Sequence, residues 1–281
     1  MTPDRVSVAA RFPEVTDRHL IFSINSGRSG SKYLSQLLAT ARDVKAFHEA
    51  EPKMNGEFID LINSAPLKSS QEKRRIKAEA IAAILRAGPP EEIYVETNHT
   101  FIKTFYDVVL EDFANVDVVI LRRELALVLK SFIELGYFSP LNPLSFSWMS
   151  SPNAATAVLP AIGPDATLDQ FDLSIAYLLD IEARAVRFKI EYPHVRTHEV
   201  RLEELNEIKG VEEFFNRLGI SPTAATREFC GRAINERRPR KERAQNPTTL
   251  DECRKRLGEY IRKAKERGIE IPASAAFTEV K

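Results

Sequence analysis

The chain has 281 residues, and its 40 Lys and Arg are balanced by 40 Asp and Glu. This length suits one large domain or two small ones and can bury a sizeable core. The balanced charge excludes a general attraction to nucleic acid or to an anionic membrane surface, so any basic site must be local.

Targeting and metal signals are absent from the sequence. No apolar run approaches the roughly 20 residues that span a bilayer, and the N-terminal residues lack the apolar core of a signal peptide. Two distant cysteines, Cys230 and Cys253, offer no disulfide framework, and five scattered histidines offer no metal-ligand spacing. We expect a cytoplasmic protein with no membrane span and no metal; its oligomeric state is not indicated.

Strand-like and helix-like segments alternate along the chain. Short apolar runs predict buried strands at residues 20–24, 44–47, 93–95, 116–121 and 195–200. Helical spacing predicts helices at about residues 33–38, 69–86, 101–113, 124–135, 168–192, 211–218 and 250–267. This alternation predicts an α/β fold, a parallel β-sheet flanked by helices on both faces. We expect one domain over residues 1–281, with a helical C-terminal segment from about residue 222.

Two segments stand apart from this pattern. The charged run at residues 72–77 is typical of a solvated helix face. Between residues 136 and 164 the periodicity is lost, and prolines and aromatic residues are spread through the segment. Loops of this length usually form binding loops or lids, or else are disordered, and the aromatic residues favour an ordered binding loop.

The first strand leads into a turn of small and polar residues, Asn25-Ser26-Gly27-Arg28-Ser29-Gly30-Ser31. A strand, a glycine-rich turn and a helix together form an anion site, because successive backbone N–H groups and the helix N-terminus converge on one point. Arg28 adds a fixed positive charge, and Ser29 and Ser31 add hydroxyl donors. The turn therefore predicts a phosphate-binding loop.

The loop departs from the pattern of nucleotide kinases. That pattern, G-x-x-x-x-G-K-S/T, requires Gly at the position of Ser31 and a hydroxyl residue at the position of Tyr33. In kinases the Ser or Thr at the position of Tyr33 normally binds Mg²⁺, so its replacement by Tyr argues against metal-assisted ATP chemistry.

A second anion-binding motif follows the fourth predicted strand. Arg123 lies at the end of this strand, and Ser131 lies eight residues later on the next helix. Two turns of helix bring the Ser131 hydroxyl close to a group that the Arg123 guanidinium can reach, which suits a second phosphate. Because both motifs follow strands of a parallel sheet, we expect them to face one crevice at its carboxyl edge.

In this order and spacing, the two motifs resemble those of the PAPS-dependent sulfotransferases, which have a P-loop-like α/β fold. Arg28, Ser29, Gly30, Ser31 and Leu34 match the family's 5′-phosphosulfate loop, whereas Lys32 replaces its second hydroxyl. The resemblance implies that Arg123 and Ser131 bind the 3′-phosphate of PAPS and that Arg238, in the basic run 237–241, lies over it. It also implies that the donor contacts the loop residues Gly27, Arg28, Ser29, Gly30, Ser31, Lys32 and Tyr33.

The same resemblance offers two candidates for the general base. A glutamate after the loop helix is the base in some members, and Glu49 lies 21 positions after Arg28. Other members carry Lys-Thr-His at the third strand end, where this chain has Glu96-Thr97-Asn98 followed by His99. Glu49 is the first choice, and Glu96 with His99 forms the rival pair.

The expected activity is transfer of a sulfuryl group from PAPS to a hydroxyl or amine, with no metal. A P-loop kinase-like transferase and a non-catalytic nucleotide-binding protein are the alternatives. The acceptor could be a small molecule, a lipid or a carbohydrate, and residues 136–164 are expected to shape its pocket.

Overall fold

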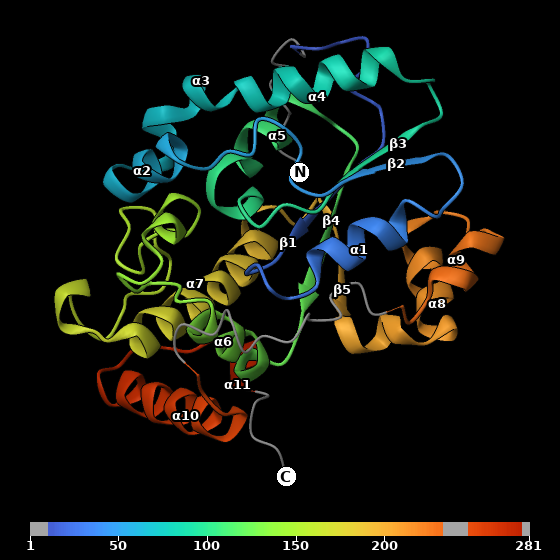
Figure 1. The fold of residues 1–281 in the computed structure, drawn as a ribbon. Coiled ribbons are helices and arrows are strands. Elements are labelled where there is room, and N and C mark those ends of the chain that lie inside the picture. The colour runs from blue at the N-terminus through green and yellow to red at the C-terminus, as the bar shows by residue number, and fades with distance from the viewer. Residues whose placement is uncertain (1–10, 233–246, 277–281) are drawn as a thin grey trace, which may run out of the picture.

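A β-sheet of five parallel strands forms the centre of the structure (Figure 1). The structure is a computed structural model and describes residues 11–232 and 247–276. The strands are β1 (Leu20–Ile24), β2 (Val44–Phe47), β3 (Ile93–Glu96), β4 (Val116–Arg122) and β5 (Arg196–Arg201). They lie in the order β2-β3-β1-β4-β5. Each matches its predicted range to within one residue at either end, and the predicted α/β class is confirmed.

The central strand β1 is buried on both faces, as its unbroken apolar sequence requires. Side chains alternate along it. Phe22 and Ile24 belong to the core on one face of the sheet, whereas Ile21 belongs to the core on the other face.

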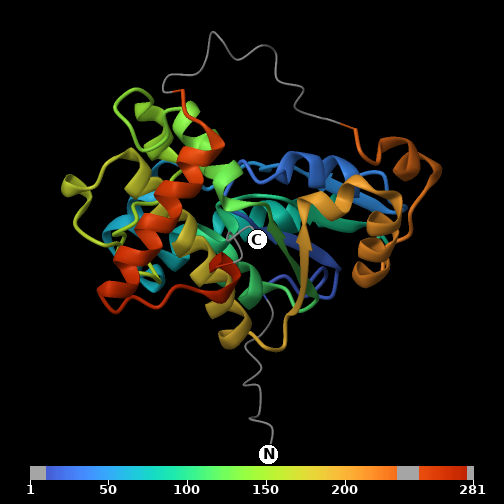
Figure 2. The same ribbon diagram turned by 90° about the horizontal axis from the view of Figure 1, so that it is seen from below.

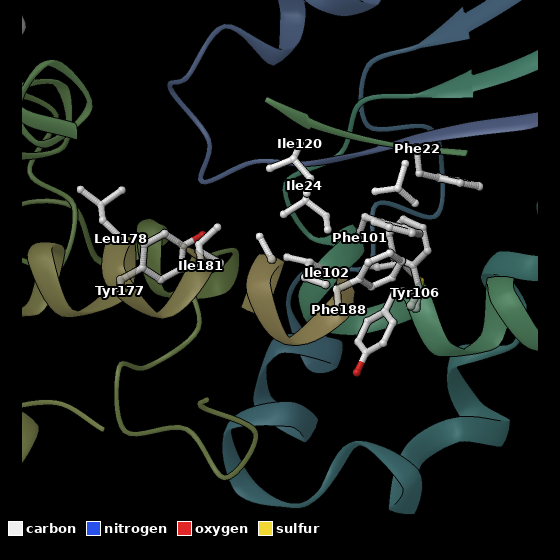
Figure 3. Packing of buried hydrophobic residues seen from close by; sticks show 14 of the residues in the cluster. Phe22, Ile24, Phe101, Ile102, Tyr106, Ile120, Tyr177, Leu178, Ile181 and Phe188 are labelled. Carbon is white, nitrogen blue, oxygen red and sulfur yellow. The ribbon is translucent and has the colours of Figure 1, made fainter. Parts of the chain in front are cut away.

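The larger core lies between the sheet and α4 (Ile76–Ala87), α5 (Tyr106–Asp112), α6 (Leu125–Glu134), α7 (Gln170–Glu191), α10 (Leu250–Glu266) and α11 (Ala273–Ala276). Figure 3 shows its centre, where Phe22 of β1 lies over Phe101. Their rings are stacked, with centroids 4.8 Å apart. The sheet and these helices form one continuous apolar cluster.

The opposite face is covered by α1 (Ser31–Leu38) and α8 (Ile208–Leu218). The short 3₁₀ helix η5 (Leu202–Asn206) connects β5 to α8, and α9 (Ala224–Phe229) follows it. Figure 2 shows α10, in red, and α8 and α9, in orange, on opposite sides of the molecule. The loop helix α1 is thus held between the sheet and the segment after β5.

Capping side chains mark the beginnings of the two longest helices. Asp169 Oδ1 accepts the Asp172 backbone N–H at 2.8 Å at the start of α7, and Thr249 Oγ1 accepts that of Glu252 at 3.1 Å at the start of α10. No helix within residues 11–232 and 247–276 is long and apolar enough to cross a membrane.

The region between β2 and β4 differs from the sequence prediction. Helix α2 (Glu57–Ser64) was not predicted, and the helix expected at 69–86 is divided into η1 (Leu67–Ser70), α3 (Gln71–Arg74) and α4. The charged run at 72–77 is not entirely solvated, since Arg74 and Lys77 are fully buried. Arg74 donates to the Asp107 carboxylate at 2.7 Å, and this pairing stabilises the buried guanidinium. The helix expected at 101–113 begins as a π-helical segment, η2 (Phe101–Phe105).

Residues 136–164 contain little regular structure, as expected. They include the 3₁₀ helix η3 (Pro143–Ser147), and a second one, η4 (Asp165–Thr167), follows. Asp180 of α7 orders part of the loop, because its Oδ1 accepts the N–H groups of Val158 and Leu159 at 2.6 and 3.0 Å. This segment is therefore tied to a core helix.

Candidate active site

A cavity of about 640 Å³ lies at the carboxyl edge of the sheet. Its lining residues follow the ends of β1, β2, β3 and β4, the edge at which parallel α/β sheets bind ligands. Its volume lies in the range of about 300–1,000 Å³ that is typical of ligand sites. Most of the sequence-predicted residues line it: Gly27, Arg28, Gly30, Ser31, Lys32, Tyr33, Glu49, His99, Arg123 and Ser131.

The cavity is strongly basic although the chain has no net charge. The cationic side chains that line it are Arg28, Lys32, Lys53, Arg123 and Arg232, and the only carboxylate among its described lining residues is that of Glu49. This concentration of positive charge suits a ligand with several negative charges. The predicted Arg238 and the run 237–241 lie outside the described residues.

The turn between β1 and α1 has the backbone of an anion-binding loop. Gly27 and Gly30 have φ angles of 77° and 99°, and Arg28 adopts a φ of 56°. A Cβ atom at Gly30 would lie 2.6 Å from Leu202 Cδ1, so only glycine fits there without a shift. Positive φ at a non-glycine residue is unfavourable and is concentrated at functional sites. The turn thus presents Arg28 to the cavity at a cost in backbone energy.

The two predicted anion-binding motifs meet at Arg28. Its Nε donates to Ser131 Oγ at 3.1 Å, and Arg123 Nη1 donates to the Arg28 carbonyl at 3.3 Å. Ser131 is 2% exposed on α6. The two motifs are brought together because the strands that precede them, β1 and β4, are hydrogen-bonded neighbours, with Ile24 opposite Ile120. Two cations and a hydroxyl, 103 residues apart at most, therefore form one cluster.

Three other loop residues have different environments. Ser29 is buried, does not line the cavity, and its Oγ has no hydrogen-bond partner in the described part of the chain. Lys32 is exposed at the cavity wall. The hydroxyl of Tyr33 is already engaged, because it donates to the Leu205 carbonyl at 2.8 Å and accepts from the Gly231 N–H at 3.1 Å. Tyr33 thus joins α1 to the C-terminal segment, and burial raises its pKa.

Glu49 lies between two imidazoles. Its Oε1 is 3.8 Å from His99 Nε2 and 4.0 Å from His48 Nε2. His48 Nε2 is also 3.2 Å from Ser31 Oγ, which connects this group to the loop. Burial lowers the pKa of His48, and the Glu49 carboxylate opposes this effect. The φ of Glu49 is 57°, so both candidate catalytic residues on the loops, Arg28 and Glu49, have strained backbones.

Glu96, the proposed partner of His99, does not line the cavity. Its Oε1 accepts from Lys77 Nζ at 2.7 Å and from Asn98 Nδ2 at 3.0 Å, and its Oε2 accepts from the Tyr94 hydroxyl at 2.6 Å. The two-residue period of β3 places Tyr94 and Glu96 on the same face of the sheet, toward α4. Glu96 is therefore corrected from a candidate base to a structural residue.

The remaining walls come from the segment 136–164, which the sequence predicted to shape the pocket, and from residues that the sequence did not identify. Tyr137, Trp148 and Met149 of the segment 136–164 line one side, and Lys53 and Asn55 line another. Behind His99 lies Lys103, fully buried, with Nζ 3.1 Å from His99 Nδ1. The sequence feature that could have indicated the burial of Lys103 is its position in the otherwise largely apolar run Phe101-Ile102-Lys103-Thr104-Phe105.

No group of three or more His, Cys, Asp or Glu residues is placed to hold a metal ion within residues 11–232 and 247–276.

Comparison with known proteins gives matches to solved structures. No family model and no curated protein matches the chain. The sulfotransferase domain from the curacin biosynthetic pathway is 14% identical with a TM-score of 0.47, over 91% of this chain and 99% of that domain. The sulfotransferase from Alicyclobacillus acidocaldarius is 12% identical with a TM-score of 0.47, over 90% and 97%. The sulfotransferase domain of the Synechococcus olefin synthase is 13% identical with the same TM-score, over 92% and 97%.

Proposed function

We propose that the protein is a sulfotransferase that takes a sulfuryl group from PAPS and transfers it to a hydroxyl or amine of a small-molecule, lipid or carbohydrate acceptor. The observation that carries this proposal is the contact of Arg28 with Ser131 and Arg123, which joins two anion-binding motifs in one basic cavity. A nucleotide with phosphate groups at both its 3′ and 5′ positions needs two such sites.

The residues present fit this donor. The Gly27 loop and Arg28 would hold the 5′-phosphosulfate, because backbone N–H groups and a guanidinium complement a compact anion. Arg123 and Ser131 would hold the 3′-phosphate. Tyr33, where kinases carry a metal-binding hydroxyl residue, has its hydroxyl bonded to Leu205 and Gly231, so it is not available to Mg²⁺.

Glu49 is the proposed base. Sulfuryl transfer breaks the bond from sulfur to the bridging phosphate oxygen and forms one from sulfur to the acceptor. The Glu49 carboxylate takes the acceptor proton, and Arg28 stabilises the negative charge that develops on the bridging oxygen. By analogy with phosphoryl transfer, positioning and charge stabilisation supply most of the rate enhancement.

A thermal-shift assay tests the choice of nucleotide. PAP in the presence of EDTA should stabilise the protein far more than ATP or ADP, since a ligand at 100 times its Kd adds about 2.7 kcal/mol to the free energy of unfolding. An equal shift with ATP, or a strict requirement for Mg²⁺, would favour a kinase. Binding of PAP without turnover across a broad acceptor panel would favour a non-catalytic protein. The cytoplasmic location and single domain remain sequence predictions.

A further inference from the structure

Lys103 lies fully buried beneath the proposed base, on the π-helical segment η2. Its Nζ is 3.1 Å from His99 Nδ1, 2.8 Å from the Trp148 carbonyl and 3.0 Å from the Tyr177 hydroxyl. No salt bridge joins it to a carboxylate among the described residues. Single π-turns are frequently found at functional sites, and a buried lysine without an anionic partner requires a physical explanation.

The direction of the three hydrogen bonds follows from the partners. The Trp148 carbonyl can only accept. The Tyr177 hydroxyl gives its own proton to the Ser26 carbonyl at 3.3 Å, so it accepts from Lys103. An ammonium has three N–H donors, and the third points at His99 Nδ1. With Lys103 as the ammonium, this nitrogen is the acceptor, and the neutral His99 ring carries its proton on Nε2.

His99 Nε2 faces the Glu49 carboxylate, with 3.8 Å between Nε2 and Oε1. We propose that Lys103 is a positioning residue that holds His99 in its neutral Nε2–H tautomer, so that His99 presents an N–H to Glu49 and Glu49, not His99, serves as the base. This inference rests on the proposed function and decides between the two base candidates of the sequence. For His99 to act as a base through Nε2, its proton would have to sit on Nδ1, opposite the Lys103 ammonium.

The charges around this pair oppose protonation of His99. Burial lowers the pKa of His99 well below its usual range, and Lys103 and His48 lower it further. Burial also lowers the pKa of Lys103, with Arg184 of α7 acting in the same direction and Glu49 and Asp180 opposing it. In this proposal Lys103 is the ammonium, which donates to the Trp148 carbonyl, the Tyr177 hydroxyl and His99 Nδ1, whereas a neutral amine would accept from Nδ1–H and leave Nε2 unprotonated.

NMR of the full-length protein labelled with ¹⁵N-histidine tests the tautomer directly, with and without PAP. His99 should show a protonated Nε2 and an unprotonated Nδ1 between pH 6 and 8, without titrating. In Lys103→Met, which keeps the side chain as far as Cε and removes the amino group, the Nε2–H tautomer should no longer be fixed and a protonated Nδ1 should appear. Tyr177→Phe is the matched control, since it removes another partner of Lys103 and should leave the His99 tautomer unchanged.

Kinetics of two His99 variants provide the second measurement. Gln retains a neutral N–H donor near the Nε2 position, so His99→Gln should retain turnover within about 10-fold, whereas His99→Ala should lose about 100-fold through misplacement of Glu49. If His99 were the base, both variants should lose about 10²–10⁴-fold. A protonated Nδ1 in the unaltered protein, or equal losses in the two variants, overturns the inference. Because the tautomer is read without a donor or acceptor, failure of PAP to bind would refute the proposed function and leave this test valid.

Discussion

The two halves of the cavity are built in different ways. The donor half consists of the Gly27 loop between β1 and α1, of Arg123 directly after β4, and of Ser131 on α6. The acceptor half consists of Glu49, His99 and residues of the segment 136–164, which lie outside the β-strands and α-helices. The residues of the donor half are thus positioned by the strands and helices next to them in sequence, whereas the residues of the acceptor half are positioned by contacts with distant segments.

Two buried lysines provide those distant contacts. Lys77 of α4 donates to the carbonyls of Ala50 and Pro52, at 2.7 and 3.1 Å, and so holds the backbone next to Glu49. Lys103 donates to the Trp148 carbonyl and so holds one end of η3. A buried polar contact is costly to break, so each lysine fixes a segment that has no ladder of backbone hydrogen bonds. This difference predicts that substitutions in the acceptor half lower turnover without weakening PAP binding, and that substitutions in the donor half weaken PAP binding.

The largest effect is expected at the base. Glu49→Gln should lower turnover by about 10²–10⁴-fold, because the amide cannot take the acceptor proton. The affinity for PAP should remain nearly unchanged, since Glu49 belongs to the acceptor half. Steady-state kinetics and calorimetry with PAP measure the two quantities. Normal turnover in this variant would refute the assignment of Glu49.

The same division explains what the sequence could predict. The strands, the Gly27 loop and the Arg123 and Ser131 pair were predictable, because each depends on residues close in sequence and on the neighbouring positions of β1 and β4. The burial of Lys77 and Lys103 was not predictable, because a charged residue in a helical pattern is expected to face solvent unless its distant hydrogen-bond acceptors are known. Glu96 was misassigned for a related reason: a strand of three or four residues does not indicate which face its last side chain takes.

Lys77→Met should damage the acceptor half through stability. It leaves the buried Glu96 carboxylate without its cation, and breaking a buried pair in this way costs about 3–5 kcal/mol. Chemical denaturation should show this loss, and turnover should fall while the folded fraction binds PAP normally. Lys73→Met is the matched control. Lys73 pairs with Glu57 at 2.6 Å on the surface, where such a pair contributes at most about 1 kcal/mol. Equal losses in the two variants would contradict the anchoring role of Lys77.

Arg123→Ala should damage the donor half alone. By analogy with truncation of one side of a buried charge pair, the loss of PAP affinity should be about 2–5 kcal/mol, or about 30- to 4,000-fold. Adenosine 5′-phosphosulfate, which has no 3′-phosphate, is the control, and its binding should change little. Arg28→Ala should weaken both nucleotides. Calorimetry that shows equal losses for both nucleotides in Arg123→Ala would exclude Arg123 as the residue that reads the 3′-phosphate.

The smallest effect, at Ser131, tests whether the donor half acts as a unit. Ser131→Ala removes a hydrogen bond to a charged group and should weaken PAP binding by about 1.5–3 kcal/mol. Because Ser131 Oγ also accepts from Arg28 Nε at 3.1 Å, the variant should release the Arg28 guanidinium and weaken adenosine 5′-phosphosulfate as well, unlike Arg123→Ala. Ser174→Ala is the matched control, since Ser174 is equally buried on α7 and its Oγ has no partner in the described part of the chain. A double-mutant cycle with Arg28→Ala should give a coupling energy of about 0.5–3 kcal/mol. Additive losses would mean that the two motifs bind their phosphates independently, and that their contact at Arg28 has no energetic role in holding the donor.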